Sequence, residues 1–169
     1  MAGNKYIKNS AGVLTEEAAI QTSAGAGDAG KIPALDAAGR LNVNMMPTGI
    51  GADTASIVTS ENLAAGDLVN LYDNAGTVTA RKADAATNKP AVGYVLAGTT
   101  SPAAATVYFE GQNNQMSGLV GGDQYLSVTV PGRTQAAAPT AAGHIVQVVG
   151  FATAATTLNF QSRAPITLA

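Results

Sequence analysis

The segment LVNLYDNAGTVTARK, residues 68–82, decides the fold class of this chain. Two runs rich in Val, Leu, Tyr and Thr, Leu68–Tyr72 and Val78–Lys82, flank the sequence DNAG at 73–76. Branched and aromatic side chains favour strands. Asn and Gly tolerate the positive φ that tight turns require. The segment therefore predicts two strands joined by a turn.

The same pattern of short strands and turns extends from Thr54 to near the C-terminus. Runs of Val, Thr, Tyr and Leu recur there between Gly, Asn, Asp and Pro residues, as in a small all-β sandwich or barrel. The further predicted strands are Ser56–Thr59, Val92–Leu96, Thr106–Glu110, Gln124–Val130, His144–Thr153 and Thr157–Gln161. We assign residues 54–169 to a β-rich body without a long helix.

Two parts of this body, at about residues 60–111 and 116–162, resemble each other. The matches are LAAGD at 63–67 with LVGGD at 119–123, VGY at 92–94 with VGF at 149–151, and VYF at 107–109 with LNF at 158–160. We expect an internal pseudo-repeat whose two units pack face to face around one core. Gly93 and Gly150 should then hold matching strand positions, and Tyr94 and Phe151 should both point into that core.

Residues 1–53 lack the pattern of the body, because their apolar side chains follow no period. Thr15 is placed to cap a short helix over Glu16–Ile20, and a glycine-rich stretch at 23–30 is typical of a flexible link. A turn is expected at 36–39. We interpret this region as an extended N-terminal arm that needs another surface. Its candidate anchors are Tyr6, Ile7, Leu14, Ile32, Leu35, Leu41, Met45 and Met46.

The composition argues against several classes of function. Charged residues make up 12% of the chain and the net charge is −2, so a general phosphate-binding surface is not expected. The chain has no Cys and one His, which disfavours an enzyme and excludes thiolate metal sites. No apolar run approaches the roughly 18 residues that span a bilayer, and no secretory segment is recognised. We expect no cofactor, metal, nucleic acid or membrane partner.

The glycine-rich stretch at 23–30 matches the spacing of phosphate-binding motifs but lacks the structure that such motifs need. Gly25, Gly27 and Gly30 satisfy the dinucleotide spacing, and Lys31 completes most of a P-loop. Both chemistries need a buried strand before the glycines and a helix after them. The stretch before Gly25 is a poor strand, and Ile32 replaces the Ser or Thr that would bind magnesium. We interpret the glycines as linker residues.

The isolated polar residues of the body are predicted to have structural roles rather than catalytic or metal-binding ones. His144 follows Gly143 at the start of an apolar strand, and no orienting acid or nucleophile is proposed for it. Asp67 and Asp123 each follow a glycine and are expected to bond local backbone N–H groups in turns. Calcium would require several converging oxygens. The pair Arg81 and Lys82 is expected on a solvated face or in a local ion pair.

The second half of the body carries unusually few charges. From residue 90 to residue 169 the charged side chains are Glu110, Asp123, Arg133 and Arg163. A small soluble domain normally has more for colloidal stability. Much of this surface is therefore expected to be covered by like subunits or by a larger body. Closed symmetry is usual for identical subunits, and we expect a trimer first and a dimer next.

Several stretches of the chain resemble small structural proteins of tailed bacteriophages, above all capsid decoration (cement) proteins. They are YIKNSAGVLTE at 6–16, GKIPALDAAGRL at 30–41, MPTGIGAD at 46–53, AGDLVNLYDNAG at 65–76, RKADA at 81–85 and TVYFEG at 106–111. The resemblance implies a β-rich body and an extended arm on the capsid shell. It also implies binding to the major capsid protein on the outside of the virion, stabilisation of the expanded head, and synthesis in the bacterial host cytoplasm.

Two segments also resemble parts of phage head and tail fibres, KIPALD at 31–36 and the region 118–127. The alternative interpretation is therefore a fibre or tail module that recognises a glycan of the host surface. Such a module needs exposed aromatic rings over a sugar-sized groove. The aromatic residues available in the body are Tyr94, Tyr108, Phe109, Tyr125, Phe151 and Phe160.

Overall fold

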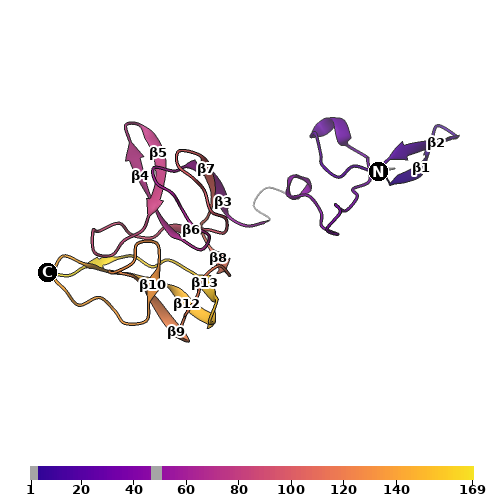
Figure 1. The fold of residues 1–169 in the computed structure, drawn as a ribbon. Coiled ribbons are helices and arrows are strands. Elements are labelled where there is room, and N and C mark those ends of the chain that lie inside the picture. The colour runs from indigo at the N-terminus through magenta and orange to yellow at the C-terminus, as the bar shows by residue number, and fades with distance from the viewer. Residues whose placement is uncertain (1–3, 47–50) are drawn as a thin grey trace. The chain divides into compact units, whose positions relative to one another are not determined.

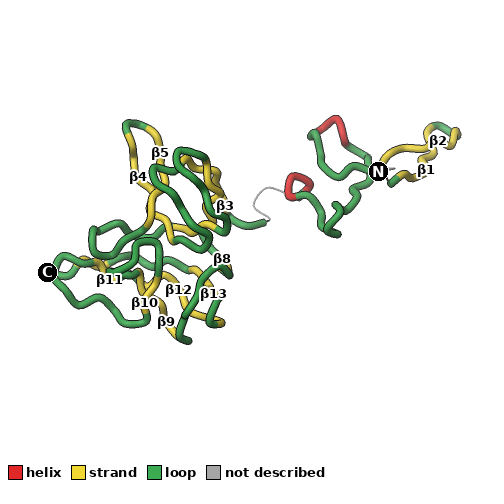
Figure 2. Tube along the Cα trace, in the orientation of Figure 1, coloured by secondary structure: helices red, strands yellow, loops and turns green. Residues whose placement is uncertain are grey.

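The computed structural model describes residues 4–46 and 51–169. The chain divides into two compact units, Met1–Gly51 and Ala52–Ala169. The second unit is built of short strands and the loops between them, and the first contains one β-hairpin (Figure 1). Helix is limited, in the described part, to two short 3-10 turns of the first unit (Figure 2). The all-β class expected from the sequence is confirmed.

The first sheet of the body contains β3 (Thr54–Val58), β4 (Leu68–Asn74), β5 (Thr77–Lys82), β6 (Gly93–Val95) and β7 (Ala104–Tyr108). Its strand order is β3-β7-β6-β4-β5. β4 and β5 form the predicted hairpin, with Leu71 opposite Ala80. Ala75 and Gly76 in its turn have φ of 52° and 87°, the positive values that a two-residue hairpin loop requires.

This first sheet curls into a small barrel. Thr59, just after β3, forms a parallel bridge with Ala80 of β5, and the Ser60 N–H donates to the Ala80 carbonyl at 3.0 Å. The two edge strands of the sheet therefore meet. The barrel interior is filled by Leu63, Val69, Ala80, Val95, Ala105 and Val107, with Ile57, Leu71 and Phe109 packed against them.

The second sheet contains β8 (Gly111–Asn113), β9 (Gly122–Leu126), β10 (Thr134–Gln135), β12 (Val148–Ala154) and β13 (Thr157–Phe160). Its order, β10-β9-β12-β13-β8, is the order of the first sheet when strands are matched by their place along the chain. β3 corresponds to β8, β4 to β9, β5 to β10, β6 to β12 and β7 to β13. β11 (Ile145–Val146) pairs separately with β14 (Ile166–Thr167). The internal repeat is thus a repeat of topology.

Gly93 and Gly150 occupy matching strand positions in the two repeats of the body, as predicted. A Cβ on Gly93 would lie 2.7 Å from the Tyr108 carbonyl oxygen, and a Cβ on Gly150 would overlap the Asn159 carbonyl oxygen. Tyr108 and Asn159 are the middle residues of the matched triplets VYF and LNF. Each glycine therefore permits the same close approach of two neighbouring strands.

The two repeats of the body were expected to pack face to face around one core, and this expectation is wrong. They stack front to back, with the inner face of one sheet against the outer face of the other. Leu68 and Tyr94 lie on the outer face of the barrel, and they share a core with Leu158 and Phe160. In the barrel, the residues that match Leu158 and Phe160 are Val107 and Phe109, which belong to the interior cluster. The inner face of the second sheet consequently covers the outer face of the first.

This stacking also corrects the expectation for the two matched aromatic residues. Tyr94 is 2% exposed in the core between the units, whereas Phe151 is 43% exposed. Phe151 lies between Asp123 and Asn159 on the outer face of the second sheet. The outer face of the first repeat's sheet is covered by the second repeat, whereas the outer face of the second repeat's sheet is open.

The N-terminal unit begins with a hairpin of β1 (Lys5–Ser10) and β2 (Val13–Ala18). The helix expected over Glu16–Ile20 is therefore wrong. Ala11 and Gly12 have φ of 51° and 86°, a combination that favours a two-residue hairpin loop. The resulting strand pairing outweighs the helix-start signal at Thr15.

The rest of this unit consists of turns and extended chain. The 3-10 turns are η1 (Ala26–Asp28) and η2 (Val43–Met45). η1 lies inside the stretch expected as a flexible link, where the Asp28 carboxylate accepts from the Ala24 N–H at 2.6 Å. The expected turn at 36–39 is present, with the Asp36 carboxylate accepting from the Ala38 and Arg40 N–H groups.

Candidate functional site

The described part of the N-terminal unit presents apolar side chains and buries none of them. Across residues 4–46 each side chain is exposed or half-buried. The term apolar arm surface is used here for its exposed large hydrophobic side chains, which are Ile7, Val13, Leu14, Ile32, Leu35, Leu41, Val43 and Met46. This surface contains six of the eight anchors expected from the sequence. Tyr6 and Met45 are half-buried instead.

The hairpin divides its side chains between two faces. Ile7 lies opposite Glu16 and Leu14 lies opposite Asn9, so alternation along the strands places Ile7 and Leu14 on one face. They are 73% and 71% exposed. An ion pair between Lys5 and Glu16 lies on the same face. This face therefore combines two free apolar groups with a charge pair at the surface.

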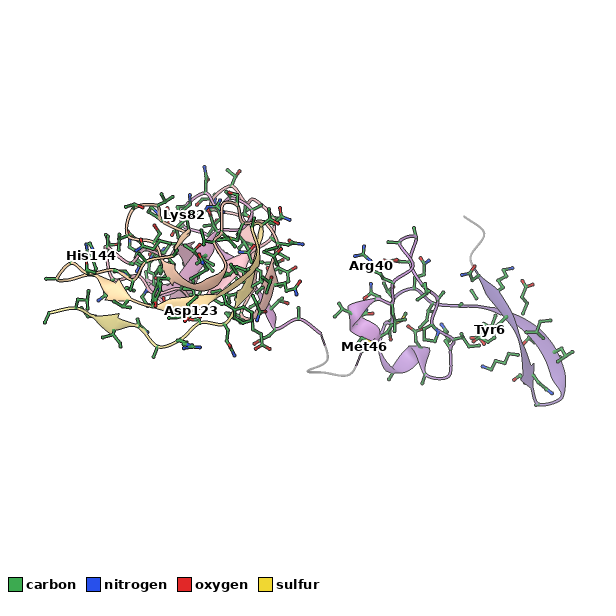
Figure 3. The ribbon with its side chains drawn as sticks, turned by 90° about the horizontal axis from the view of Figure 1, so that it is seen from below. Tyr6, Arg40, Met46, Lys82, Asp123 and His144 are labelled. Carbon is green, nitrogen blue, oxygen red and sulfur yellow. The ribbon has the colours of Figure 1, made fainter. Side chains whose placement is uncertain are left out.

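The other face of the hairpin turns toward the rest of the unit. Tyr6 lies opposite Glu17 there, and its hydroxyl is screened from solvent without a hydrogen-bond partner among the described residues. The Asp28 carboxylate, 2.9 Å from the Lys31 ammonium, raises the pKa of Lys31, and Glu17 and Tyr6 add smaller electrostatic contributions. Tyr6 thus serves an internal contact, as its position in Figure 3 illustrates.

Backbone polar contacts hold the remainder of the arm. Ile20 forms a parallel bridge with Pro33, and its carbonyl accepts from the Ala34 N–H at 2.7 Å. The Gln21 amide donates to the Leu35 carbonyl at 2.9 Å. Because the chain is held through polar groups, the side chains of Ile32 and Leu35 are left exposed. A two-stranded hairpin with such a surface is marginally stable by itself, so it suits contact with another surface.

Val13 and Val43 belong to the apolar arm surface but were not among the predicted anchors. They are 62% and 71% exposed. Val13 follows the turn at Ala11 and Gly12, and recognising that turn would have placed it on a strand. Val43 lies in η2, which Asn42 caps by accepting from the Asn44 N–H at 3.0 Å. The available signal for this turn was Asn42, because an Asn side chain can accept a hydrogen bond from the backbone N–H two residues later.

The body contains a buried ion-pair cluster that sequence reasoning missed. Asp67 is 1% exposed. Its carboxylate accepts from the Ala64 N–H at 2.8 Å, the expected turn contact. It also lies 3.4 Å from the Lys82 ammonium and 3.1 Å from the Arg133 guanidinium. Asp123, the matching residue of the second unit, is exposed on β9.

The other polar residues singled out in the sequence have structural roles. Arg81 donates to the Asn70 amide oxygen at 2.9 Å, and its guanidinium lies 4.1 Å from the centre of the Tyr72 ring. Asp84, two residues after the basic pair Arg81 and Lys82, accepts from the Ala86 N–H and the Thr87 hydroxyl. His144 directly precedes β11, at the strand start predicted for it.

Two searches of the described residues concerned metal-ligand groups and membrane-spanning helices. Within ranges 4–46 and 51–169, no three His, Asp or Glu side chains gather where they could hold a metal ion. Neither of the described helical turns has the length or hydropathy to cross a bilayer. The exposed side chains of the apolar arm surface make it the candidate functional site, as a surface for protein contact.

Comparison of the chain with protein-family models, curated proteins and solved structures found no match.

Proposed function

We propose that this protein is a capsid decoration protein that binds the outside of a phage capsid and stabilises the expanded head lattice. One observation carries the proposal: an N-terminal unit that has no buried side chain among residues 4–46, and that bears the apolar arm surface, precedes a body that has its own cores. The buried cores of the body stabilise its fold, and the exposed apolar side chains of the arm are suited to bind another surface. The resemblance of the chain to phage decoration proteins supports the same assignment.

The mechanism is thermodynamic linkage. A ligand that binds the expanded lattice and not its alternatives stabilises that lattice by its difference in affinity. Burial of one apolar side chain contributes roughly 1.5–3 kcal/mol before ordering costs. A few anchors such as Ile7, Leu14 and Leu35 would suffice, because many copies bind each symmetric shell.

The low charge of the second half of the body supports self-association on the shell. Arg133, one of its four charges, is already engaged with Asp67. Exposed apolar side chains are present in the same region, at Val92, Val120, Val130, Phe151 and Ile166. We propose a trimer first and a dimer next. Sedimentation equilibrium of the full chain at several concentrations tests association in solution. A monomer at all of them would leave only assembly induced by the capsid lattice, and decorated capsids without clustered density would then contradict the proposal.

The capsid proposal is tested by cosedimentation with expanded capsids of the cognate phage. Full-length Ile7→Asp/Leu14→Asp places two charges on the exposed hairpin face and should weaken binding by at least about tenfold. The matched control is Val78→Asp, which introduces a charge at an exposed valine of the body outside the low-charge region and should bind like the unaltered chain. Deletion of residues 1–53 should abolish most binding and leave the body folded, by circular dichroism. Equal binding of all variants would show that the arm is not the anchor.

A further inference from the structure

A surface pocket of about 230 Å³ lies on the outer face of the barrel. One wall is built by β7, where alternation places Ala104, Thr106 and Tyr108 on the same side of the strand. The other wall is the segment after β6, with Leu96, Ala97 and Thr99. Leu96 and Tyr108 also pack against the core between the two repeats of the body.

The aromatic wall of the pocket is held in place from behind. Tyr108 stacks on Tyr94 with ring centres 5.4 Å apart and an interplanar angle of 21°. Tyr94 in turn contacts Phe160 of the second unit at 5.4 Å between ring centres. Since Tyr94 and Phe160 are buried, the Tyr108 ring rests on a rigid support. It is a preorganised surface, which lowers the entropic cost of binding a ligand.

The chemistry of the lining is neutral and mixed. Its polar side-chain groups are the hydroxyls of Thr99, Thr106 and Tyr108, and none of the six lining residues is Asp, Glu, Lys, Arg or His. Hydroxyls can both donate and accept hydrogen bonds. A neutral ligand rich in hydroxyl groups fits this lining, whereas an ion would find no opposite charge within it.

We propose that this pocket binds a single neutral sugar ring, with the apolar face of the ring against Tyr108 and ring hydroxyls bonded to Thr99 and Thr106. Its volume is below the roughly 300–1,000 Å³ of pockets for drug-sized ligands, so one ring is the matching size. The negative face of an aromatic ring attracts weakly positive groups, such as the C–H bonds of a sugar. This inference does not depend on capsid attachment.

The test uses backbone-amide NMR of the full chain, titrated with methyl glycosides of galactose, glucose, mannose and N-acetylglucosamine. At least one should shift the amides of Leu96, Thr106 and Tyr108 with a dissociation constant of about 1–10 mM. Thr106→Val keeps the strand propensity of a branched residue and removes one hydroxyl. It should weaken binding about 3- to 10-fold. Thr77→Val, at an exposed threonine of β5, is the matched control and should bind like the unaltered chain.

Three outcomes would overturn the proposal. The first is that no glycoside shifts the pocket amides at up to about 50 mM, far above the expected dissociation constants. The second is that Thr106→Val and Thr77→Val respond alike. The third is that N-acetylneuraminic acid or tetramethylammonium binds the pocket more tightly than every neutral glycoside, which would indicate a charged ligand. Thr106→Val should cosediment with capsids as the unaltered chain does, so failure of either proposal leaves the other intact.

Discussion

Asp67 of the first repeat and Arg133 of the second are joined by a contact of 3.1 Å between carboxylate and guanidinium. The carboxylate is almost fully buried, while about a third of the arginine side chain is exposed. Around this pair the Leu68 N–H donates to the Gly132 carbonyl at 2.8 Å. The ion pair therefore sits at a seam where the two repeats also share backbone hydrogen bonds.

Removing this carboxylate should destabilise the body substantially. Asp67→Ala removes the carboxylate that the Lys82 ammonium, the Arg133 guanidinium and the Ala64 N–H contact. Loss of one partner of a buried pair costs about 3–5 kcal/mol. Because the two cations are partly exposed, we expect about 2–4 kcal/mol in urea denaturation. Asp123→Ala, at the exposed matching residue, should change stability by less than about 0.5 kcal/mol. Equal losses for the two variants would contradict a special role for Asp67.

The close strand approach at the matched glycines predicts strong sensitivity to a single methyl group. At Gly150 the added Cβ would overlap the Asn159 carbonyl oxygen, and φ there is 145°. Gly150→Ala should therefore cost about 2–4 kcal/mol. Gly121→Ala is the control, because a Cβ there meets nothing within 4 Å. Thermal denaturation followed by circular dichroism measures both, and a Gly150→Ala melting curve matching that of the control would argue against this strand geometry.

Front-to-back stacking predicts opposite outcomes for two phenylalanines of the second sheet. Phe160 is 1% exposed in the core between the units, whereas Phe151 is on the open face. Phe160→Ala should destabilise by about 3–5 kcal/mol, and Phe151→Ala should cost less than about 1 kcal/mol. Chemical denaturation of the two variants compares them directly. If Phe151→Ala costs as much as Phe160→Ala, the units do not stack in this direction.

The turn at Asp36 should respond to acid. Hydrogen bonds from the Arg40 and Ala38 N–H groups lower the pKa of Asp36 from its ordinary value of 3.8. A carboxylate with a lowered folded-state pKa stabilises the turn above the ordinary pKa, and this contribution is lost as the pH falls through the folded-state pKa. We therefore expect the Ala38 and Arg40 amide signals to move below about pH 4. Asp36→Asn removes the titrating group, and unchanged acid shifts in that variant would assign the effect elsewhere.

Local sequence determined much of the body. Most strands of the body were predicted within a few residues of their observed bounds, as in the hairpin 68–82, because branched residues and turn-forming residues are both local signals. The region 144–153 was predicted as one strand and divides into β11 and β12. β8, β10 and β14 were missed because each has only two or three residues. Such short strands exist through pairing with a neighbour rather than through their own propensity.

The candidate site was predicted in part for the same reason. Apolar residues without a period indicated an arm that buries nothing, and six of the anchors are exposed. The hairpin was missed because Thr15 and Glu16 also satisfy a helix start, and sequence cannot decide between a helix and a paired strand when both signals are local. The partial burial of Tyr6 could not be predicted, because the turn at Asp28 and Lys31 lies far along the chain.

The sequence by itself determined the all-β class, the main hairpin and the presence of two matched repeats. Composition, turn residues and repeated motifs are local properties of the chain and do not depend on tertiary contacts. The tertiary structure alone decided which face of each unit is buried. Alternation along a strand separates Tyr94 from Val95 but leaves both sides apolar in the first unit. Which side meets the second unit depends on contacts between residues more than 50 positions apart, such as Tyr94 and Phe160. The burial of Tyr94 and the exposure of Phe151 follow from that long-range choice.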